Sequence, residues 1–389
     1  MDRNYRELFD RPVDRMGTNS VKWDNAKKVF GRDVLPMWVA DMDFATAPEI
    51  IEALEARVSH GIFGYTYVSE EDKMAVVNWE KRRHHTDIEP DWVLESPGVV
   101  DSLFFVLKAL FDEGDGIVIQ PPVYGPFAGS CKRAGLCAME APLVNTEAGW
   151  KMDLGAVEDC LKKGAKGMIL CSPHNPVGRV WTRGELTALV SLLNRYGAKL
   201  VCDEIHADFE LPGAVHEPIL SIEGAEKAVM LISATKTFNL AAMRHSSIIA
   251  GDENIRNAIR ARMTDFYVTG PSVLSIVAQR AAYEKGGAWL DALNGYLGGN
   301  RDLAEAFFRE ADGVSVRHLE GSYLMFVDFR VLNIDQDTLA DRLVRAGVGL
   351  NKGTDFGEAG RGFMRLNLAT TRANVTEGLD RIMKAVKNV

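Results

Sequence analysis

One lysine of the chain, Lys236, stands directly after an apolar run, AVMLIS at 228–233, and between Thr235 and Thr237. A free lysine amine has a pKa of about 10.4, so at neutral pH it is protonated and a poor nucleophile. Burial and nearby positive charge lower that pKa and release the neutral amine. Lys236 is therefore a candidate amine nucleophile, although a lysine at a strand end can also simply extend its charge to solvent.

A carboxylate and a histidine close another apolar run, KLVCDE at 199–204. Asp203 at its end needs a cation or hydrogen-bond donors, which a helix N-cap, an ion pair or a ligand's protonated ring nitrogen would supply. His206, three residues later, can offer a neutral donor or acceptor to the same ligand, or be a satisfied residue at a helix start. A metal site fits poorly, because no further His or Cys cluster has usable spacing.

Two segments are suited to an anion such as phosphate. Arg244 lies eight positions after Lys236, and arginine offers several donors in a rigid, permanently charged fork. The hydroxyls of Ser233 and Thr235 could add donors, or could equally cap the local backbone. Val99 and Val100 open the helical pattern of 96–115, where free N–H groups and the helix dipole favour an anion.

Three more residues complete the set of candidates. Tyr124 in PPVYGPF could stack on a planar ligand or pack in the core, and Asn175 in HNPVG offers an amide or serves a turn. Arg365 in GFMRLNLATT would bind a substrate carboxylate if it points inward, and is a surface residue if it points outward. Together these side chains suit pyridoxal 5'-phosphate, whose aldehyde a lysine captures as an imine while an aspartate keeps the ring nitrogen protonated.

The elements that must position these residues are short apolar strands separated by helical patterns. The strands are nearly continuously hydrophobic, which is typical of a parallel sheet covered on both faces; they are expected at 116–120, 167–171, 199–204, 228–233 and 246–251. The segment 182–197 is predicted to be a helix that Thr182 caps and Gly197 ends. In such α/β sheets, ligands bind outside the carboxyl ends of the strands, where four candidate segments fall.

The sequence predicts two domains. The α/β pattern occupies residues 47–285, the expected large cofactor-binding domain with a mostly parallel sheet flanked by helices. Residues 1–46 and 286–389 are expected to form a smaller α+β domain from both ends of the chain, with a strand-like run at 321–330.

Composition excludes several classes of protein. The chain has 389 residues, 47% hydrophobic and 25% charged, with a net charge of -9, so neither disorder nor a nucleic-acid surface is indicated. No apolar run approaches the roughly 20 residues that span a bilayer. The charged N-terminus argues against a signal peptide, and five cysteines without zinc spacing indicate reduced thiols. We expect a cytoplasmic protein with a small-molecule substrate and neither nucleic acid nor membrane as partner.

With these motifs in place, the chain resembles the fold-type I PLP-dependent enzymes, the aspartate aminotransferase superfamily. The segment SATKTFNLAAMR is similar to the superfamily's Schiff-base lysine followed by its phosphate-binding arginine. The segments NSVKWD, MWVADMDF, GYTY, SPGVV, CSPHNPVGRVW and DEIHAD are similar to those of the MalY/PatB-type cystathionine β-lyases, also called C–S lyases. These matches extend over nearly the whole chain.

The resemblance implies a role for each residue around the cofactor ring. Lys236 would carry the internal aldimine and then move the Cα proton, Asp203 would pair with the pyridine nitrogen, and Tyr124 would stack on the ring. These three are the expected catalytic residues. Asn175 would bond the phenolic oxygen and help to hold the substrate, whose α-carboxylate would bind Arg365.

The resemblance also implies the remaining contacts. Val99, Val100, Ser233 and Arg244 would bind the cofactor phosphate. Tyr65 of GYTY would reach across a dimer interface to the neighbour's phosphate, which implies a homodimer with shared active sites. Many superfamily members have a tyrosine at the position of His206, so the residue type here departs from the common pattern. His206 would be a second partner of the phenolic oxygen. Ala40, together with Asp41, would line the substrate entrance.

The expected reaction is β-elimination from cystathionine or other L-cysteine S-conjugates, which yields a thiol, pyruvate and ammonia. The motifs are equally compatible with a class I/II aminotransferase, because both reactions use the same anchoring residues. A lyase with a second, regulatory protein-binding role is a further alternative.

Overall fold

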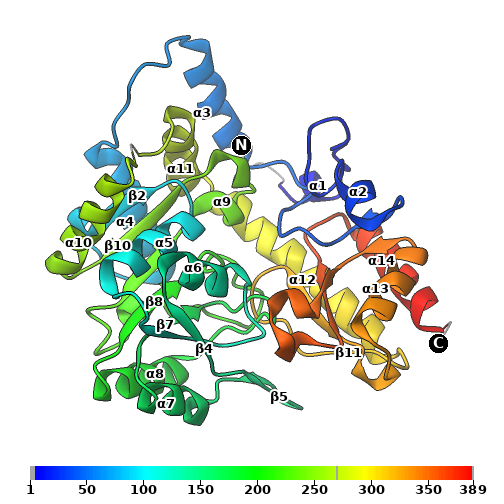
Figure 1. The fold of residues 1–389 in the computed structure, drawn as a ribbon. Helices are drawn as coiled ribbons and strands as arrows, with labels where there is room; N and C mark the ends of the chain where they lie inside the picture. The colour runs from blue at the N-terminus through cyan, green and yellow to red at the C-terminus, as the bar shows by residue number, and fades with distance from the viewer. Residues whose placement is uncertain (1–4, 269, 388–389) are drawn as a thin grey trace.

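The computed structural model describes residues 5–268 and 270–387 and places a seven-stranded sheet at its centre (Figure 1). The strands lie in the order β2–β10–β9–β8–β7–β3–β4. Their bounds are β2 Val93–Ser96, β3 Gly116–Ile119, β4 Cys137–Glu140, β7 Ala165–Cys171, β8 Lys199–Asp203, β9 Val229–Ile232 and β10 Ser246–Ala250. All five apolar runs that were predicted as strands are strands.

The sheet is mostly parallel, as predicted. Strands β4, β3, β7, β8 and β9 pair in parallel, whereas β10 pairs antiparallel with both β9 and β2. The sequence did not distinguish β10 from the others. Its direction follows from the connection after β9, which holds only α9 (Ala234–Thr237) and the 3-10 turn η3 (Ala241–Met243), so the chain turns back without a long crossover helix.

Alternate residues of the central strands face two separate cores, as the pleat of a strand requires. Ile169 and Val201 pack with α5 (Val99–Leu110), α6 (Pro126–Ala134) and α10 (Glu253–Asp265) on one face. Met168 and Leu200 point to the other face, against α7 (Leu154–Lys162) and α8 (Arg183–Arg195). The predicted helix at 182–197 is confirmed as α8. Thr182 accepts a hydrogen bond from the Glu185 backbone nitrogen at 3.3 Å, and Gly197 follows the helix with φ of 64°.

A second, four-stranded sheet is formed by the last third of the chain in the order β11–β12–β15–β14. It is antiparallel, with β11 Ser315–Val316, β12 Leu324–Asp328, β14 Asn351–Lys352 and β15 Phe363–Asn367. The helices of this region are α12 Gly287–Arg309, α13 Gln336–Arg345 and α14 Arg372–Lys387. The N-terminal segment joins it, because β1 (Leu35–Pro36) pairs with β13 (Val348–Gly349), and blue and red ribbons accordingly lie on the same side in Figure 1.

The remaining elements complete the chain. They are α1 Arg6–Phe9, α2 Ala26–Phe30, α3 Pro48–Ser59, α4 Glu70–His84, α11 Val273–Lys285, β5 Val144–Thr146 and β6 Gly149–Lys151, with 3-10 turns η1 Pro90–Trp92, η2 Ile219–Ser221, η4 Arg330–Leu332, η5 Gly353–Phe356 and η6 Glu358–Gly360. Within the described ranges, no helix combines the length and apolarity that crossing a bilayer would need.

Candidate active site

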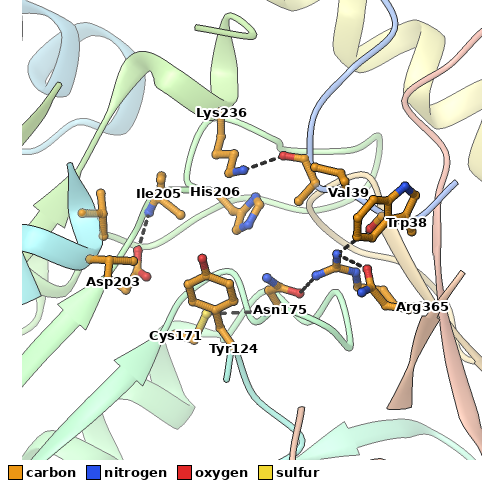
Figure 2. A pocket seen from close by; sticks show the side chains of 14 residues that line it. Trp38, Val39, Tyr124, Cys171, Asn175, Asp203, Ile205, His206, Lys236 and Arg365 are labelled. Carbon is orange, nitrogen blue, oxygen red and sulfur yellow. Dashed lines mark hydrogen bonds between the residues drawn. The ribbon is translucent and has the colours of Figure 1, made fainter. Parts of the chain in front are cut away.

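A cavity of about 330 Å³ opens at the carboxyl ends of the central strands. Its walls come from three regions far apart in sequence: the segment 38–40, the ends of the central strands with the segments that follow β2, β3, β7, β8 and β9, and strands β14 and β15 of the second sheet. In Figure 2 the side chains of Lys236, Asp203, Tyr124, Asn175 and Arg365 surround this opening. The four strand-end segments singled out in the sequence therefore do meet at one edge of the sheet.

Lys236 lies on the one-turn helix α9, whose N-cap is Ser233. Its Nζ atom donates a hydrogen bond to the backbone carbonyl of Ala40, drawn as a dashed line in Figure 2. Burial and the positive charge of Arg365 lower the pKa of Lys236 to about 8, against a smaller opposing effect of Asp41 and Asp203. A substantial fraction of this amine is therefore neutral near physiological pH.

Asp203 is 4% exposed at the end of β8. Its Oδ1 atom accepts a hydrogen bond of 3.1 Å from the Ile205 backbone N–H, and among the described residues it forms no ion pair. Burial raises the pKa of Asp203 to about 7, although the Ile205 N–H and the charge of Lys236 oppose that rise. A buried carboxyl group in this state favours a ligand that brings a cation.

Arg365 points inward from β15 and is 5% exposed. Its guanidinium donates from Nη1 to Asn175 Oδ1 at 3.2 Å, and from Nη2 to the Trp38 carbonyl at 2.7 Å and to Asn351 Oδ1 at 2.8 Å. Burial lowers its pKa to about 10, so the group stays charged at neutral pH. No carboxylate pairs with it among the ion pairs of the described chain, which leaves its charge available to an anionic ligand.

Asn175 and Tyr124 face the same cavity. Because Asn175 Oδ1 accepts from Arg365, its Nδ2 group is oriented as a donor toward other partners. The Tyr124 ring makes an edge-to-face contact with Phe127 at 6.0 Å between centroids, which fixes the plane of the ring. Burial raises the pKa of Tyr124, so its hydroxyl remains protonated.

His206 is buried beside the cavity, with 2% exposure. Burial, followed by the charges of Lys236 and Arg365, lowers its pKa to about 3. Its Nδ1 atom lies 3.3 Å from the hydroxyl of Ser322, which follows β11. His206 is thus a neutral imidazole, able to donate or accept a hydrogen bond without adding charge to the cavity.

The start of helix α5 forms one wall of the cavity through Val99 and Val100. Gly98 precedes them as N-cap and carries no side chain, so no side-chain hydrogen bond caps this helix. The first backbone N–H groups of α5 therefore remain available, and the helix dipole adds partial positive charge. This is a suitable place for a phosphate group.

Five residues suggested by the sequence do not line the cavity in this chain: Asp41, Tyr65, Ser233, Thr235 and Arg244. Ser233 donates its hydroxyl proton to the His245 carbonyl at 2.6 Å. Arg244 has a 68% exposed side chain and pairs with Asp101 at 3.1 Å. Tyr65 lies in the loop between α3 and α4 and is fully exposed.

Several residues of the cavity were missed or left without a role by the sequence. Trp38 and Val39 belong to the MWVADMDF segment and Cys171 to CSPHNPVGRVW, so both segments offered a signal, whereas Asn351 carried none. Tyr323 lies beside the cavity and donates its hydroxyl to the Ala40 carbonyl at 3.0 Å. Ala40 itself thus serves as an acceptor for two side chains.

The segment that carries Trp38 to Ala40 is held by an N-terminal ion-pair network. Arg15 pairs with Asp41 at 2.8 Å and with Asp43 at 2.9 Å. Lys22, with 0% exposure, reaches Asp43 at 2.9 Å. Because Lys22 is buried and paired, its loss would leave the Asp43 carboxylate inadequately compensated.

Comparisons with known proteins agree with this geometry. The family model of class I and II aminotransferases matches residues 32–382. The chain is 39% identical to the cystathionine β-lyase PatB of Bacillus subtilis over 97% of this chain and 99% of PatB. It is 35% identical to the protein MalY of Escherichia coli over 98% of this chain and 99% of MalY.

A solved structure with the same fold is cystalysin from Treponema denticola, which contains a pyridoxal 5'-phosphate cofactor. It superposes with a TM-score of 0.94 at 33% identity, covering 98% of each chain. The predicted fold, a mostly parallel α/β sheet of the PLP fold type I, is confirmed by this similarity. The chain belongs to the class I and II aminotransferase family, in the same group as the cystathionine β-lyase PatB and the protein MalY.

Proposed function

We propose that the protein is a PLP-dependent C–S β-lyase that cleaves cystathionine or other L-cysteine S-conjugates to a thiol, pyruvate and ammonia. One observation carries the proposal: three complementary side chains line the same cavity. They are the Lys236 amine, whose pKa is about 8, the buried carboxyl group of Asp203, and the Arg365 guanidinium, which forms no ion pair with a carboxylate of the described chain. Full-length similarity to PatB at 39% identity supports the lyase reaction in particular.

The residues present fit pyridoxal 5'-phosphate. The uncapped start of α5 suits the phosphate, the buried Asp203 suits a protonated ring nitrogen, and the cavity of about 330 Å³ lies within the range that small ligands occupy. When bound, the cofactor supplies an aldehyde for a lysine amine and a ring that accepts the electron pair released at the substrate Cα.

The side chains of this protein would perform the binding and proton steps. Arg365 would hold the substrate α-carboxylate with its charged fork, while the Asn175 Nδ2 group would donate to the phenolic oxygen of the cofactor. Asp203 would keep a proton on the ring nitrogen, and Tyr124 would hold the ring from one face. Lys236 would accept the Cα proton. Because thiolate is a good leaving group, the main remaining requirement for the elimination is the correct orientation of the substrate relative to Lys236.

The phosphate contacts are proposed in two groups. The backbone N–H groups of Val99 and Val100 lie at the cavity wall, so they would bind the phosphate directly. Ser233 and Arg244 would contribute after small side-chain rearrangements, since Ser233 now donates to His245 and Arg244 pairs with Asp101. His206 would be a second partner of the phenolic oxygen, and Ala40 would line the substrate entrance.

We further propose that the enzyme works as a homodimer in which Tyr65 completes the phosphate site of the partner. The loop around Tyr65 exposes several large apolar side chains next to each other, which is typical of a protein interface. These are Val58 at 51%, Ile62 at 65%, Phe63 at 55%, Tyr65 at 112% and Tyr67 at 82% exposure. Tyr65 is fully exposed and does not line the cavity of its own chain, so its side chain would be available to the cavity of a second copy.

The division of the chain into domains is also proposed. Residues 47–285 contain the seven-stranded sheet and would form the large domain, whereas 1–46 and 286–389 contain β1 and the four-stranded sheet and would form the small one. The pairing of β1 with β13 supports this assignment of the N-terminal segment. A cytoplasmic location is proposed as well, supported by five cysteines that are all free thiols.

The decisive experiment supplies purified protein with cystathionine and pyridoxal 5'-phosphate and measures pyruvate and free thiol. The lyase reaction requires no keto acid, so both products should accumulate in its absence. A class I/II aminotransferase is the second candidate, favoured by the family that matches residues 32–382. A strict requirement for an added keto acid, with no thiol released, would replace the lyase with that alternative.

A further inference from the structure

A group of buried ionisable residues adjoins the segments that carry Lys236 and Asp203, outside the lining of the cavity. This buried cluster consists of His84, Glu204, Asp208 and His216, which are between 2% and 6% exposed. None of them lines the cavity. Two of them are, however, directly connected to the catalytic segments. Glu204 is the next residue after Asp203, and Asp208 accepts a hydrogen bond from Thr237, the next residue after Lys236.

Asp208 connects three separate elements. Its Oδ2 atom accepts a hydrogen bond of 2.6 Å from the hydroxyl of Thr237, the residue next to Lys236. Its Oδ1 atom accepts 2.9 Å hydrogen bonds from Trp79 Nε1 and His84 Nε2, both on α4. The Asp208 carbonyl accepts from Asn294 Nδ2 of α12 at 2.8 Å. The Lys236 turn is thus tied to α4 through the Asp208 carboxylate and to α12 through the Asp208 backbone carbonyl.

Glu204 is held in a similar way on the other side of the cluster. It directly follows Asp203, and its Oε2 atom lies 2.8 Å from His216 Nε2 while Oε1 accepts from the Ile219 backbone N–H at 2.8 Å. The two histidine rings, His84 and His216, meet edge to face with their centroids 5.5 Å apart. The supports of Lys236 and Asp203 therefore contact each other.

The Asp208 carboxylate is ionised despite its burial. Burial alone would raise its pKa, but the hydrogen bonds from His84, Thr237 and Trp79 and the charge of His84 lower it overall. Hydrogen bonds to an ionised acceptor are about twice as strong as those between neutral groups. The bond from Thr237 to Asp208 is short and charge-assisted, so it restrains the one-turn helix that carries Lys236.

We propose that Asp208 is a positioning residue for the lyase reaction: through the Thr237 hydroxyl it fixes the Lys236 amine relative to Asp203. The inference rests on the proposed function for its catalytic consequence, but the geometry concerns this chain's own residues. Helix α9 has only four residues, too few to hold its own shape, so an external anchor is required. A displacement of about 1 Å of a catalytic group can cost about 100-fold in rate.

The test compares T237V, which removes the hydroxyl at nearly constant volume, with T237S, which retains it. T370V is the matched control, because Thr370 is also buried, at 2% exposure, and its hydroxyl also takes part in a side-chain hydrogen bond, which it accepts from Asn374. Three quantities are measured: kcat and KM for a cysteine S-conjugate, the thermal midpoint, and the pH midpoint at which Lys236 of the cofactor-stripped full-length chain is acetylated.

The proposal expects T237V to lower kcat by about tenfold or more with little change in KM, and to shift the labelling midpoint by at least about half a pH unit. T237S and T370V should match the wild type in both quantities. If T237V does not fold, D208N answers the same question, because its amide keeps the volume and the Trp79 and His84 contacts while removing the charge. The kcat of D208N should lie between that of the wild type and the value expected of T237V.

Two results would overturn the proposal. T237V could lose thermal stability while keeping wild-type kcat and labelling midpoint, which would make the cluster purely structural. T237S could instead behave as T237V does, which would show that the hydroxyl is not the cause. Failure of the wild type to cleave any C–S bond would refute the proposed function, yet the labelling midpoints would still decide whether Asp208 positions Lys236.

Discussion

Arg365 and Asn175 lie 190 positions apart in the sequence and are joined by a 3.2 Å hydrogen bond from Nη1 to Oδ1. This contact connects β15 of the four-stranded sheet with the loop after β7 of the seven-stranded sheet. It places a permanent positive charge opposite Lys236. Each of these residues consequently depends on the packing of the two sheets against each other.

The first prediction concerns this arginine. R365K keeps a positive charge but loses the fork that contacts Asn175, Trp38 and Asn351, so kcat/KM should fall by about 10- to 100-fold, mainly through KM. Steady-state pyruvate release measures the effect. R361K is the control, because Arg361 lies on the same sequence segment with a 57% exposed side chain. An unchanged KM in R365K would contradict carboxylate binding by Arg365.

The second prediction concerns the nucleophile. K236A should lower kcat by at least about 10²- to 10⁴-fold, because the general base and the amine that captures the cofactor are lost together. Thermal unfolding monitored by circular dichroism should show that the fold persists. K162A, which changes a lysine with a 55% exposed side chain, serves as control. If K236A kept the turnover of the wild type, the amine that captures the cofactor would have to belong to another lysine.

The third prediction follows from the pKa of Lys236. With a pKa of about 8, roughly one amine in ten is neutral at pH 7, against fewer than one in a thousand for an ordinary lysine. In the cofactor-free protein, acetylation of Lys236 should therefore rise steeply as the pH increases from 7 to 9 and then level off. Peptide mass spectrometry follows the site. A midpoint above pH 10 would show that burial does not depress this pKa.

The fourth prediction concerns Asp203. D203N retains the shape of the side chain but cannot carry the negative charge that keeps a ring nitrogen protonated. Turnover should fall on the order of 10²-fold, the cost of removing one preorganised electrostatic contact. D159N, at a carboxylate with a 68% exposed side chain, is the matched control. If D203N and D159N were equally active, the ring-nitrogen role of Asp203 would have to be abandoned.

The fifth prediction tests the shared site. Neither K236A nor Y65A should be active alone, but a heterodimer of the two would have one site with an intact Lys236 from one subunit and an intact Tyr65 from the other. After random reassociation, about half of the dimers are mixed and activity should reach about a quarter of wild type. Size-exclusion chromatography with light scattering verifies the dimer. Mixtures that remain inactive would place Tyr65 outside the partner's site.

The strand pattern of the sequence was sufficient to predict much of this arrangement. The apolar runs ending at Cys171, Asp203 and Ile232 form adjacent strands, and parallel strands necessarily bring their following residues to one edge. Asn175, Asp203 and Lys236 could therefore be expected to lie together. The local strand pattern was enough to predict this placement, because each parallel strand of the sheet ends at the same edge.

Other features had no local signal. Arg365 donates to the carbonyl of Trp38 across 327 positions and to the side chain of Asn351. Asp208 meets Trp79 across 129 positions. Such contacts depend on how helices and sheets pack, and neither periodicity nor turn chemistry records them. The antiparallel direction of β10 was missed for a related reason, since its apolar composition is the same as that of a parallel neighbour.

The origin of the cavity walls from both ends of the chain has a consequence for biosynthesis. A ribosome adds Arg365 327 residues after Trp38, whose backbone carbonyl Arg365 contacts in the cavity wall. The nascent polypeptide can build its central sheet first, but it cannot complete the cavity before residue 365 has been added. Premature termination before residue 365 would therefore release a chain whose cavity lacks its buried arginine.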